Sequence, residues 1–287
     1  MMNWKQLISA KRFGMEEFHE ERQENRSEFQ RDYDRLIFSA PFRRLQNKTQ
    51  VFPLPGSVFV HNRLTHSLEV ASVGRSLGDD VAKALLERHP ELQDSFLPEI
   101  GSIVSAACLA HDLGNPPFGH SGEKAISTFF SEGKGVRLKE KQPNGEQLSP
   151  MEWEDLTHFE GNANAFRILT HQFEGRRKGG FVLTYTTLAS IVKYPFSSSL
   201  AGTKSKFGFF VSEEESFQKI ATELGLTLLN EHPLKYARHP LVYLVEAADD
   251  ICYQMMDIED AYKLKILTTE ETKELLMTYF SEERQEH

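Results

Sequence analysis

The sequence is poor in cysteine, in long apolar runs and in basic charge. Only two of its 287 residues are cysteines, Cys108 and Cys252, so a disulfide scaffold and a zinc site made of cysteines alone are excluded, and a reducing compartment, the cytoplasm, is favoured. No apolar run approaches the roughly 20 residues that cross a bilayer, and residues 1–12 lack the apolar segment of a secretory signal. We therefore expect neither a membrane partner nor export.

The charge balance disfavours a second class of protein. Lys and Arg number 33 against 42 Asp and Glu, a formal net charge of −9 at pH 7. Excess negative charge repels the phosphate backbone of DNA and RNA, although a local basic patch can still hold a small polyanion. Nucleic acid is therefore not expected as the main partner.

What the chain does contain is enough apolar material for a large core. It is 39% hydrophobic and has 21 Phe and 8 Tyr, which argues against disorder. Two irregular stretches, residues 133–150 and 197–216, are interpreted as surface insertions rather than linkers between domains. We predict a single helical domain over residues 1–287.

Helical periodicity dominates the chain. Apolar residues recur every three to five positions within residues 65–89 and again within 99–112, and residues 240–267 begin with proline and are apolar almost all round at first, as in a buried helix. Shorter helices are predicted at residues 15–24, 122–130, 162–170, 214–230 and 270–279. The clearest strand signal is a small β-hairpin at residues 49–60, so the predicted fold class is mainly α.

The richest chemistry lies at the end of the second long helix. The apolar stripe of that helix extends by one step of three to His111, which places an imidazole on the buried face with Asp112 beside it. An unpaired buried carboxylate costs several kcal/mol, so Asp112 needs a cation, a metal or several hydrogen-bond donors. A packed histidine beside a hydrogen-bonded aspartate at a helix end is the simpler interpretation of this pair alone.

Two further helices carry inward-facing polar residues. His66 leads the apolar side of the first helix, and Asp249 follows the apolar side of the last, with Tyr253 and Asp257 at +4 and +8 from it. Taken singly, each could be a satisfied core group. His66 and Asp249 complete, with His111 and Asp112, a set of two imidazoles and two carboxylates. This set suits a divalent metal if the four side chains converge.

These residues stand in an ordered series of motifs that resembles a known family. The pattern His66, His111-Asp112, Asp249 looks like the signature of the HD-domain metal-dependent phosphohydrolases. The surrounding motifs, from about residue 24 to about residue 261, resemble in order the dNTP triphosphohydrolase (dGTPase-like) family: Arg31-Asp-Tyr-Asp-Arg35, Phe42-Arg-Arg-Leu45, Lys48-Thr-Gln-Val-Phe52, His61-Asn-Arg-Leu-Thr-His66, His111-Asp-Leu-Gly-Asn-Pro-Pro-Phe-Gly-His120, His158-Phe-Glu-Gly-Asn162 and Glu246-Ala-Ala-Asp-Asp-Ile-Cys-Tyr253.

The resemblance implies a helical HD-domain fold and a metal-dependent activity. The family hydrolyses a deoxynucleoside triphosphate, with dGTP the expected substrate here, to a deoxynucleoside and inorganic triphosphate. By this resemblance a divalent ion, Mg²⁺ or Mn²⁺ first and Fe, Co, Ni or Zn as alternatives, is held by His66, His111, Asp112 and Asp249. Such an ion can polarise a phosphate and lower the pKa of a bound water from about 15.7 towards about 7.

The resemblance also assigns roles beside the metal. His120 and Glu123 are expected to act in proton transfer and water positioning at the scissile bond, and their spacing of three puts them on one helical face. The alternative is that His120 caps a helix and Glu123 is a solvated acid in its first turn.

Binding of the nucleotide is assigned to eight further residues. Arg63, Lys193 and His158 correspond to phosphate-binding positions, whereas exposed surface charge is the alternative for Arg63 and Lys193. The positions that resemble sugar and base contacts are Gln50, Asn162, Tyr194, Tyr253 and Asp257. For Tyr253 the alternative is ordinary core packing.

Three further points concern the C-terminal region, the assembly and the alternative functions. Family members continue beyond the last long helix, whereas this sequence stops at His287, so we expect the C-terminal helical region of the family to be lacking. The resemblance implies a homo-oligomer, with no readable symmetry in the sequence. Another HD nucleotide phosphohydrolase and a catalytically inert nucleotide-binding HD scaffold remain the alternative functions.

Overall fold

A computed structural model describes residues 2–17, 26–50, 61–140, 142–143, 145–175, 178–202 and 205–280. Helices dominate these residues, and the only strands among them are β1 (Leu228–Asn230) and β2 (Lys235–Tyr236), a short antiparallel pair. The predicted fold class, mainly α, is confirmed. Residues 51–60 of the predicted hairpin lie outside the described residues. Beside them, Thr49 pairs with Asn62 in an isolated antiparallel bridge.

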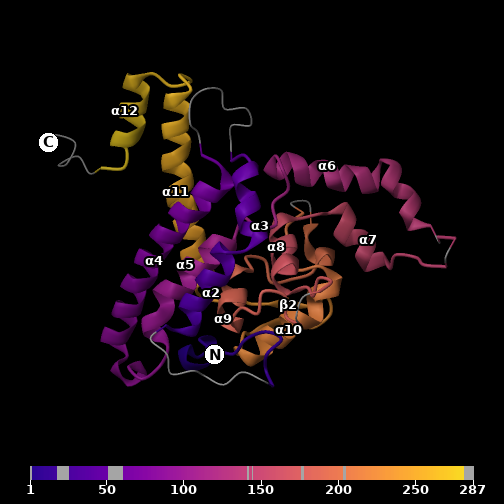
Figure 1. Ribbon diagram of the computed structural model, residues 1–287, viewed down its shortest axis with the longest axis horizontal. Coiled ribbons are helices and arrows are strands. Elements are labelled where there is room, and N and C mark those ends of the chain that lie inside the picture. The colour runs from indigo at the N-terminus through magenta and orange to yellow at the C-terminus, as the bar shows by residue number, and fades with distance from the viewer. Residues whose placement is uncertain are drawn as a thin grey trace.

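Three helices form the framework on which the candidate residues are placed. They are α4 (Arg63–Arg88), α5 (Ile100–Ala110) and α11 (Val242–Lys263) (Figure 1). Every residue of α5 is buried, because α4, α11, α2 (Glu28–Ile37) and α9 (Tyr185–Ile191) all pack against it. The backbones of α4 and α5 approach closely at Gly78, where an added Cβ would lie 2.7 Å from the Cα of Gly101. Glycine at this crossing therefore sets the depth of the packing.

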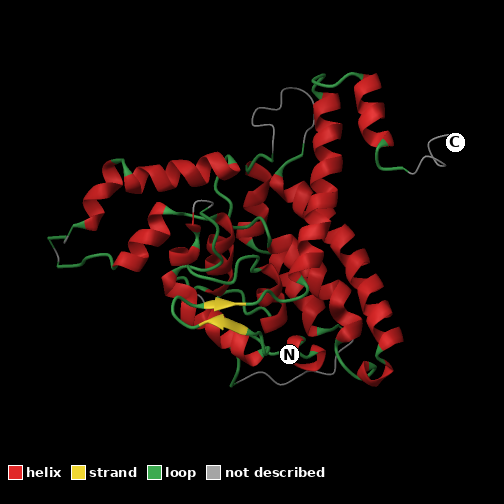
Figure 2. Cartoon of the chain, turned by 180° about the vertical axis from the view of Figure 1, so that it is seen from behind, coloured by secondary structure: helices red, strands yellow, loops and turns green. Residues whose placement is uncertain are grey.

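The remaining elements surround this framework. The helices α6 (Gly119–Ser131) and α7 (Pro150–Thr157) extend away from it as an arm, and α12 (Thr269–Met277) lies beside the end of α11, as both views show (Figures 1 and 2). The other helices are α1 (Trp4–Leu7), α3 (Ala40–Arg44), α8 (Gly161–Thr170) and α10 (Glu214–Glu223), with 3₁₀ turns at Leu45–Asn47, Pro90–Leu92, Leu97–Glu99, Lys134–Lys139, Ser198–Leu200 and Val211–Glu213. No described helix is both long and apolar enough to cross a bilayer.

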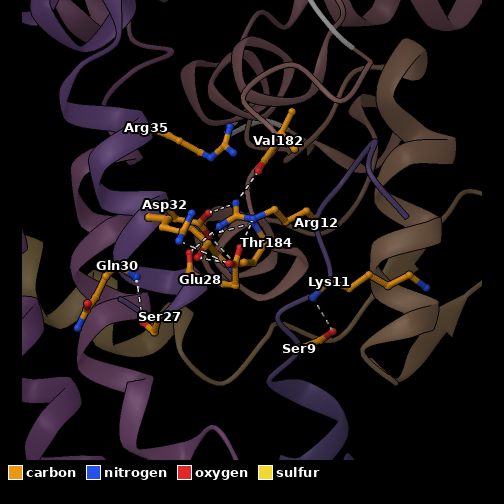
Figure 3. Close-up of polar contacts among 12 residues, drawn as sticks. Ser9, Lys11, Arg12, Ser27, Glu28, Gln30, Asp32, Arg35, Val182 and Thr184 are labelled. Carbon is orange, nitrogen blue, oxygen red and sulfur yellow. Dashed lines mark hydrogen bonds and ion pairs between the residues drawn. The ribbon is translucent and has the colours of Figure 1, made fainter. Parts of the chain in front are cut away.

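A buried ionic cluster ties the N-terminal segment to this body (Figure 3). The Arg12 guanidinium, 2% exposed, donates to both Glu28 and Asp32 and to the carbonyl of Val182. The second oxygen of Asp32 accepts the backbone N–H and the hydroxyl of Thr184 at 2.9 and 2.6 Å. Both carboxylates thus accept hydrogen bonds from Arg12, and the cluster joins the N-terminal segment, α2 and the segment at residues 182–184.

Most predicted helices are confirmed, within a few residues at their ends. The segment predicted at residues 214–230 is wrong in its second half, because α10 ends at Glu223 and Gly225 takes the left-handed φ of +66° that stops a helix. The chain then forms β1. For the segment predicted at 15–24, residues 15–17 are not helical and 18–24 lie outside the described residues.

One buried histidine makes stability depend on pH. His239 is 1% exposed, donates from Nε2 to the carbonyl of Leu7 and accepts the N–H of Leu241 at Nδ1. Burial lowers the pKa of its imidazole to about 4. Below a pH of about 6.5 the unfolded chain therefore takes up a proton that the folded protein refuses until about pH 4, and the free energy of unfolding falls over this window by roughly 1.4 kcal/mol per pH unit.

We expect urea denaturation to show this effect by comparison with His239→Gln. Between pH 7.5 and 5.0 the parent should lose about 2 kcal/mol more unfolding free energy than the variant, which has no titrating group at this position. Equal losses in the two proteins would mean that His239 titrates normally in the folded state.

Candidate functional site

A cavity of about 400 Å³ lies where α4, α5, the start of α6 and α11 meet. Its lining brings together every predicted site residue except His158 and Asp257. The twelve are Gln50, Arg63, His66, His111, Asp112, His120, Glu123, Asn162, Lys193, Tyr194, Asp249 and Tyr253. Segments separated by up to two hundred residues thus contribute to one pocket.

Local structure aims the two histidines into this cavity. His66 lies in the first turns of α4, which starts at Asn62 with a capping box formed by Asn62 and Thr65. His111 follows the last residue of α5, and its Nδ1 donates to the carbonyl of Cys108 at 2.6 Å. The ring centroids are 5.3 Å apart. The bond to Cys108 orients the ring of His111, so that Nε2 is the nitrogen left for the cavity.

Both carboxylates lie next to these rings. Asp249 Oδ1 is 2.9 Å from His66 Nε2 and 3.6 Å from His111 Nε2. Asp112 Oδ1 is also 3.6 Å from His111 Nε2, while its Oδ2 accepts from Arg63 Nη1 at 2.6 Å and its Oδ1 accepts from Asn115 Nδ2. Asp112 is therefore oriented by an arginine and an amide, as the cost of burying it requires.

The electrostatics of this cluster favour added positive charge. Burial disfavours an imidazolium at His111, but Asp112 and Asp249 outweigh it and raise the pKa of His111 to about 9. The same attraction lowers the pKa of Asp112 and of Asp249, in each case against the opposing effect of burial. At neutral pH the imidazolium of His111 therefore balances part of the negative charge of the two carboxylates, and a divalent ion coordinated at Nε2 would take the place of that proton.

The donor set fits a divalent metal ion. One ligand atom from each of His66, His111 and Asp112 lies within 4.8 Å of the others, so the three could hold an ion. His111 Nε2 is buried without a hydrogen-bond partner, which costs energy unless a ligand uses it. Asp249 is not among these three, but its Oδ1 lies 2.9 and 3.6 Å from the Nε2 atoms of His66 and His111, so its assignment as a fourth ligand stays a prediction. Two imidazoles with two carboxylates accommodate Mg²⁺, Mn²⁺ or a later transition metal.

A second polar pair lies at the start of α6. His120 Nδ1 is 2.7 Å from Glu123 Oε2, and Glu123 Oε1 accepts the backbone N–H of Gly161 at 2.8 Å. The Glu123 side chain is buried, whereas that of His120 is 84% exposed. Glu123 is therefore held rigidly and its partner is free to reach a ligand. The alternative of a solvated Glu123 is wrong.

Lysine and arginine side chains line the pocket, each next to a carboxylate. Arg63 pairs with Asp112, and Lys193 Nζ is 2.9 Å from Glu246 Oε1. Lys206 Nζ is 2.8 Å from Glu160 Oε1 and 3.7 Å from Glu123 Oε2, and these acids raise its pKa despite its partial burial. Arg63 and Lys193 are therefore not free surface charges.

Two predicted residues lie outside the cavity lining. His158 contacts its own helix, α7, with Nδ1 at 3.2 Å from Glu154 Oε2. Asp257 hydrogen-bonds the Tyr253 hydroxyl, and Tyr253 is 47% exposed, so simple core packing does not describe it. The sugar and phosphate roles of these residues stay predictions.

Several pocket residues were missed by sequence reasoning. Lys206 and Glu246 contribute charge, Asn115 orients Asp112, and Phe118 lies at the rim. Asn115 and Phe118 stand inside the motif His111–His120, which was a usable signal. Lys206 stands in an irregular stretch without periodicity, so only the fold reveals it.

Comparison with known proteins shows which proteins this chain is similar to. Residues 63–178 match the family model described as HD domain, a range that includes every predicted site residue from Arg63 to Asn162 but neither Lys193 nor Asp249. A Pseudomonas aeruginosa protein named deoxyguanosinetriphosphate triphosphohydrolase-like is 46% identical over 284 residues, 96% of this chain and 61% of that protein. A Synechocystis protein of the same name is 45% identical over 275 residues, 93% of this chain and 61% of that protein.

A third relative carries the enzyme name itself. The Yersinia enterocolitica protein named deoxyguanosinetriphosphate triphosphohydrolase is 36% identical over 304 residues, covering 94% of this chain and 57% of that protein. The chain thus aligns along nearly all of its own length, but spans only about 61% of the first two relatives.

Proposed function

We propose that this chain, an HD-domain protein related along most of its length to the deoxyguanosinetriphosphate triphosphohydrolase-like proteins, is a metal-dependent hydrolase of deoxynucleoside triphosphates. Its products would be the deoxynucleoside and inorganic triphosphate, with dGTP as the first substrate to test. The names of the relatives suggest the substrate, and the site of this chain supplies the chemistry.

One observation carries the proposal. Three residues of the cavity lining each have a buried polar atom without a hydrogen-bond partner among the described residues: Gln50 Oε1, Arg63 Nε and His111 Nε2. Each such atom costs roughly 1–3 kcal/mol unless it is satisfied. A pocket that concentrates them beside carboxylates and cations is built to be completed by a polar, charged ligand.

The residues assigned to the metal are His66, His111, Asp112 and Asp249. A divalent ion held there would polarise the α-phosphate and make water a stronger nucleophile near neutral pH. Cys108 supports this assignment, because its carbonyl orients the ring of His111 so that Nε2 is the nitrogen left to coordinate.

His120 and Glu123 are assigned to the leaving group. When water attacks the α-phosphorus, the bond from phosphorus to the 5′-oxygen breaks and that oxygen must receive a proton. The exposed His120 ring is placed to deliver it, and the buried Glu123 carboxylate orients that ring by holding Nδ1 at 2.7 Å. The other oxygen of Glu123 is fixed by Gly161 N–H, so the pair stays aligned.

The triphosphate is assigned to Arg63, Lys193 and Lys206. All three already balance carboxylates, so the substrate must share or displace those ion pairs. Arg63 bonds Asp112 through Nη1, and its Nε has no hydrogen-bond partner, so a phosphate contact at Nε would not break the bond to Asp112. Local cations would thereby draw an anion into a protein of net charge −9.

The predicted cytoplasmic location and homo-oligomeric assembly remain predictions that accompany this function. Light scattering of the purified protein tests the assembly.

Product analysis tests the proposal. Purified protein is incubated with each dNTP and Mg²⁺ or Mn²⁺, and the products are separated by ion-exchange chromatography. We expect deoxynucleoside and inorganic triphosphate in equal amounts, and none after chelation of the metal. Release of orthophosphate or pyrophosphate instead would contradict the assigned reaction.

A further inference from the structure

Phe118 stands where the turn that contains it normally requires glycine. The N–H of Gly119 donates to the carbonyl of Pro116 at 3.1 Å, which closes a turn with Pro117 and Phe118 at its centre. Phe118 has φ 66° and ψ 20°, close to the values of the third position of a type II turn, where Gly or Asn is usual and proline commonly precedes. A bulky aromatic residue in this left-handed region is a genuine outlier.

The strained residue gains nothing from burial in return. Its side chain is 62% exposed, and it lines the rim of the cavity rather than the core. Its neighbour Gly119 lies against Arg63, because an added Cβ there would be 2.7 Å from Arg63 Nη2. The turn therefore lies against the arginine that orients Asp112, and it carries an exposed ring. Strain retained at such a place points to a function of the ring.

We infer that Phe118 is a stacking platform for the nucleobase of the substrate, which rests on the proposed function. The ring face carries partial negative charge and is unsuited to phosphates, whereas every base offers a flat surface that stacks on it. Tyr194, another aromatic of the pocket, already faces the cations Lys193 and Arg238, which suits the anionic end of the ligand. Tyr253 is tied through its hydroxyl to Asp257.

Stacking predicts a selective loss of affinity. In a Glu123→Ala background, which prevents turnover, Phe118→Asn keeps a residue that tolerates the left-handed turn and removes the ring. Calorimetry with Mn²⁺ should show a Kd about 10-fold higher for dGTP and for dATP, and an unchanged Kd for inorganic tripolyphosphate. Phe118→Tyr should restore dNTP affinity. The matched control is Phe129→Asn, which removes another exposed ring of α6 outside the cavity lining.

Thermal melting separates this role from a structural one. Phe118→Asn should melt no lower than the parent, since the exposed ring is lost and the turn becomes easier to adopt. Equal weakening of dGTP and tripolyphosphate, or a lower melting temperature with weaker binding of both, would overturn the inference.

The outcomes also separate this inference from the proposed function. If Phe118→Asn leaves the Kd for dGTP unchanged while the unmodified protein hydrolyses dGTP, only the stacking platform is rejected. A parent that binds dGTP through Phe118 but releases no triphosphate rejects the hydrolase and leaves the platform supported. A parent that binds no dNTP rejects both.

Discussion

Asp112→Ala should abolish metal binding and turnover together. Asp112 contributes one of the three ligand atoms within 4.8 Å of each other and is the partner of Arg63. Its removal deletes a donor and leaves a buried arginine unpaired, so we expect at least about 100-fold weaker Mn²⁺ binding by calorimetry, because even changes behind a ligand cost 10–100-fold. dNTP hydrolysis should fall to background.

Two further variants make this result interpretable. Asp112→Asn keeps an acceptor for Arg63 but loses the charge, so it should lose metal affinity while melting closer to the parent than Asp112→Ala does. Asp80→Ala removes an exposed acid of α4 far from the pocket lining and should bind Mn²⁺ as the parent does. Hydrolysis at the parental rate by Asp112→Ala would contradict the metal assignment.

Glu123→Gln should lower turnover without lowering metal affinity, whereas Asp112→Ala should lower both. The amide fills the same space and can still accept the N–H of Gly161, but it no longer offers a carboxylate oxygen to Nδ1 of His120. Because general acid–base groups contribute about 10²–10⁴-fold, we expect turnover to fall by that factor while Mn²⁺ affinity stays within about twofold of the parent.

The control for this experiment lies on the same element. Glu132→Gln changes an exposed acid at the end of α6 and should leave both properties unchanged. If Glu123→Gln instead loses Mn²⁺ and turnover in proportion, Glu123 belongs to the metal centre and its assignment to the leaving group is wrong.

Regular periodicity explains which helices could be predicted. α4, α5 and α11 carry apolar stripes, and their ends are marked by Asn62, Pro240 and the Gly114–Pro117 turn. α2 was missed because two of its four buried residues, Glu28 and Asp32, are charged, and their burial depends on Arg12 from another part of the chain. Partnerships of this kind are tertiary and leave no local pattern.

The candidate site, too, could be predicted from the sequence only in part. The resemblance identified residues that the fold does bring to one cavity, and His66, His111 and Asp249 among them stand at a helix end or on an inward helix face. His158 was expected there, but it caps the C-terminal end of α7 and lies 3.2 Å from Glu154, one turn earlier in that helix. Lys206 enters the cavity through its contact with Glu160, which the sequence cannot reveal.

The position of a bound metal ion tests the account most directly. Crystals grown with Mn²⁺ and measured at a wavelength with anomalous signal should show one strong peak within about 2.5 Å of nitrogen atoms of His66 and His111 and oxygen atoms of Asp112 and Asp249. A peak at another place, or none between these four side chains in protein that binds Mn²⁺ stoichiometrically, would contradict it.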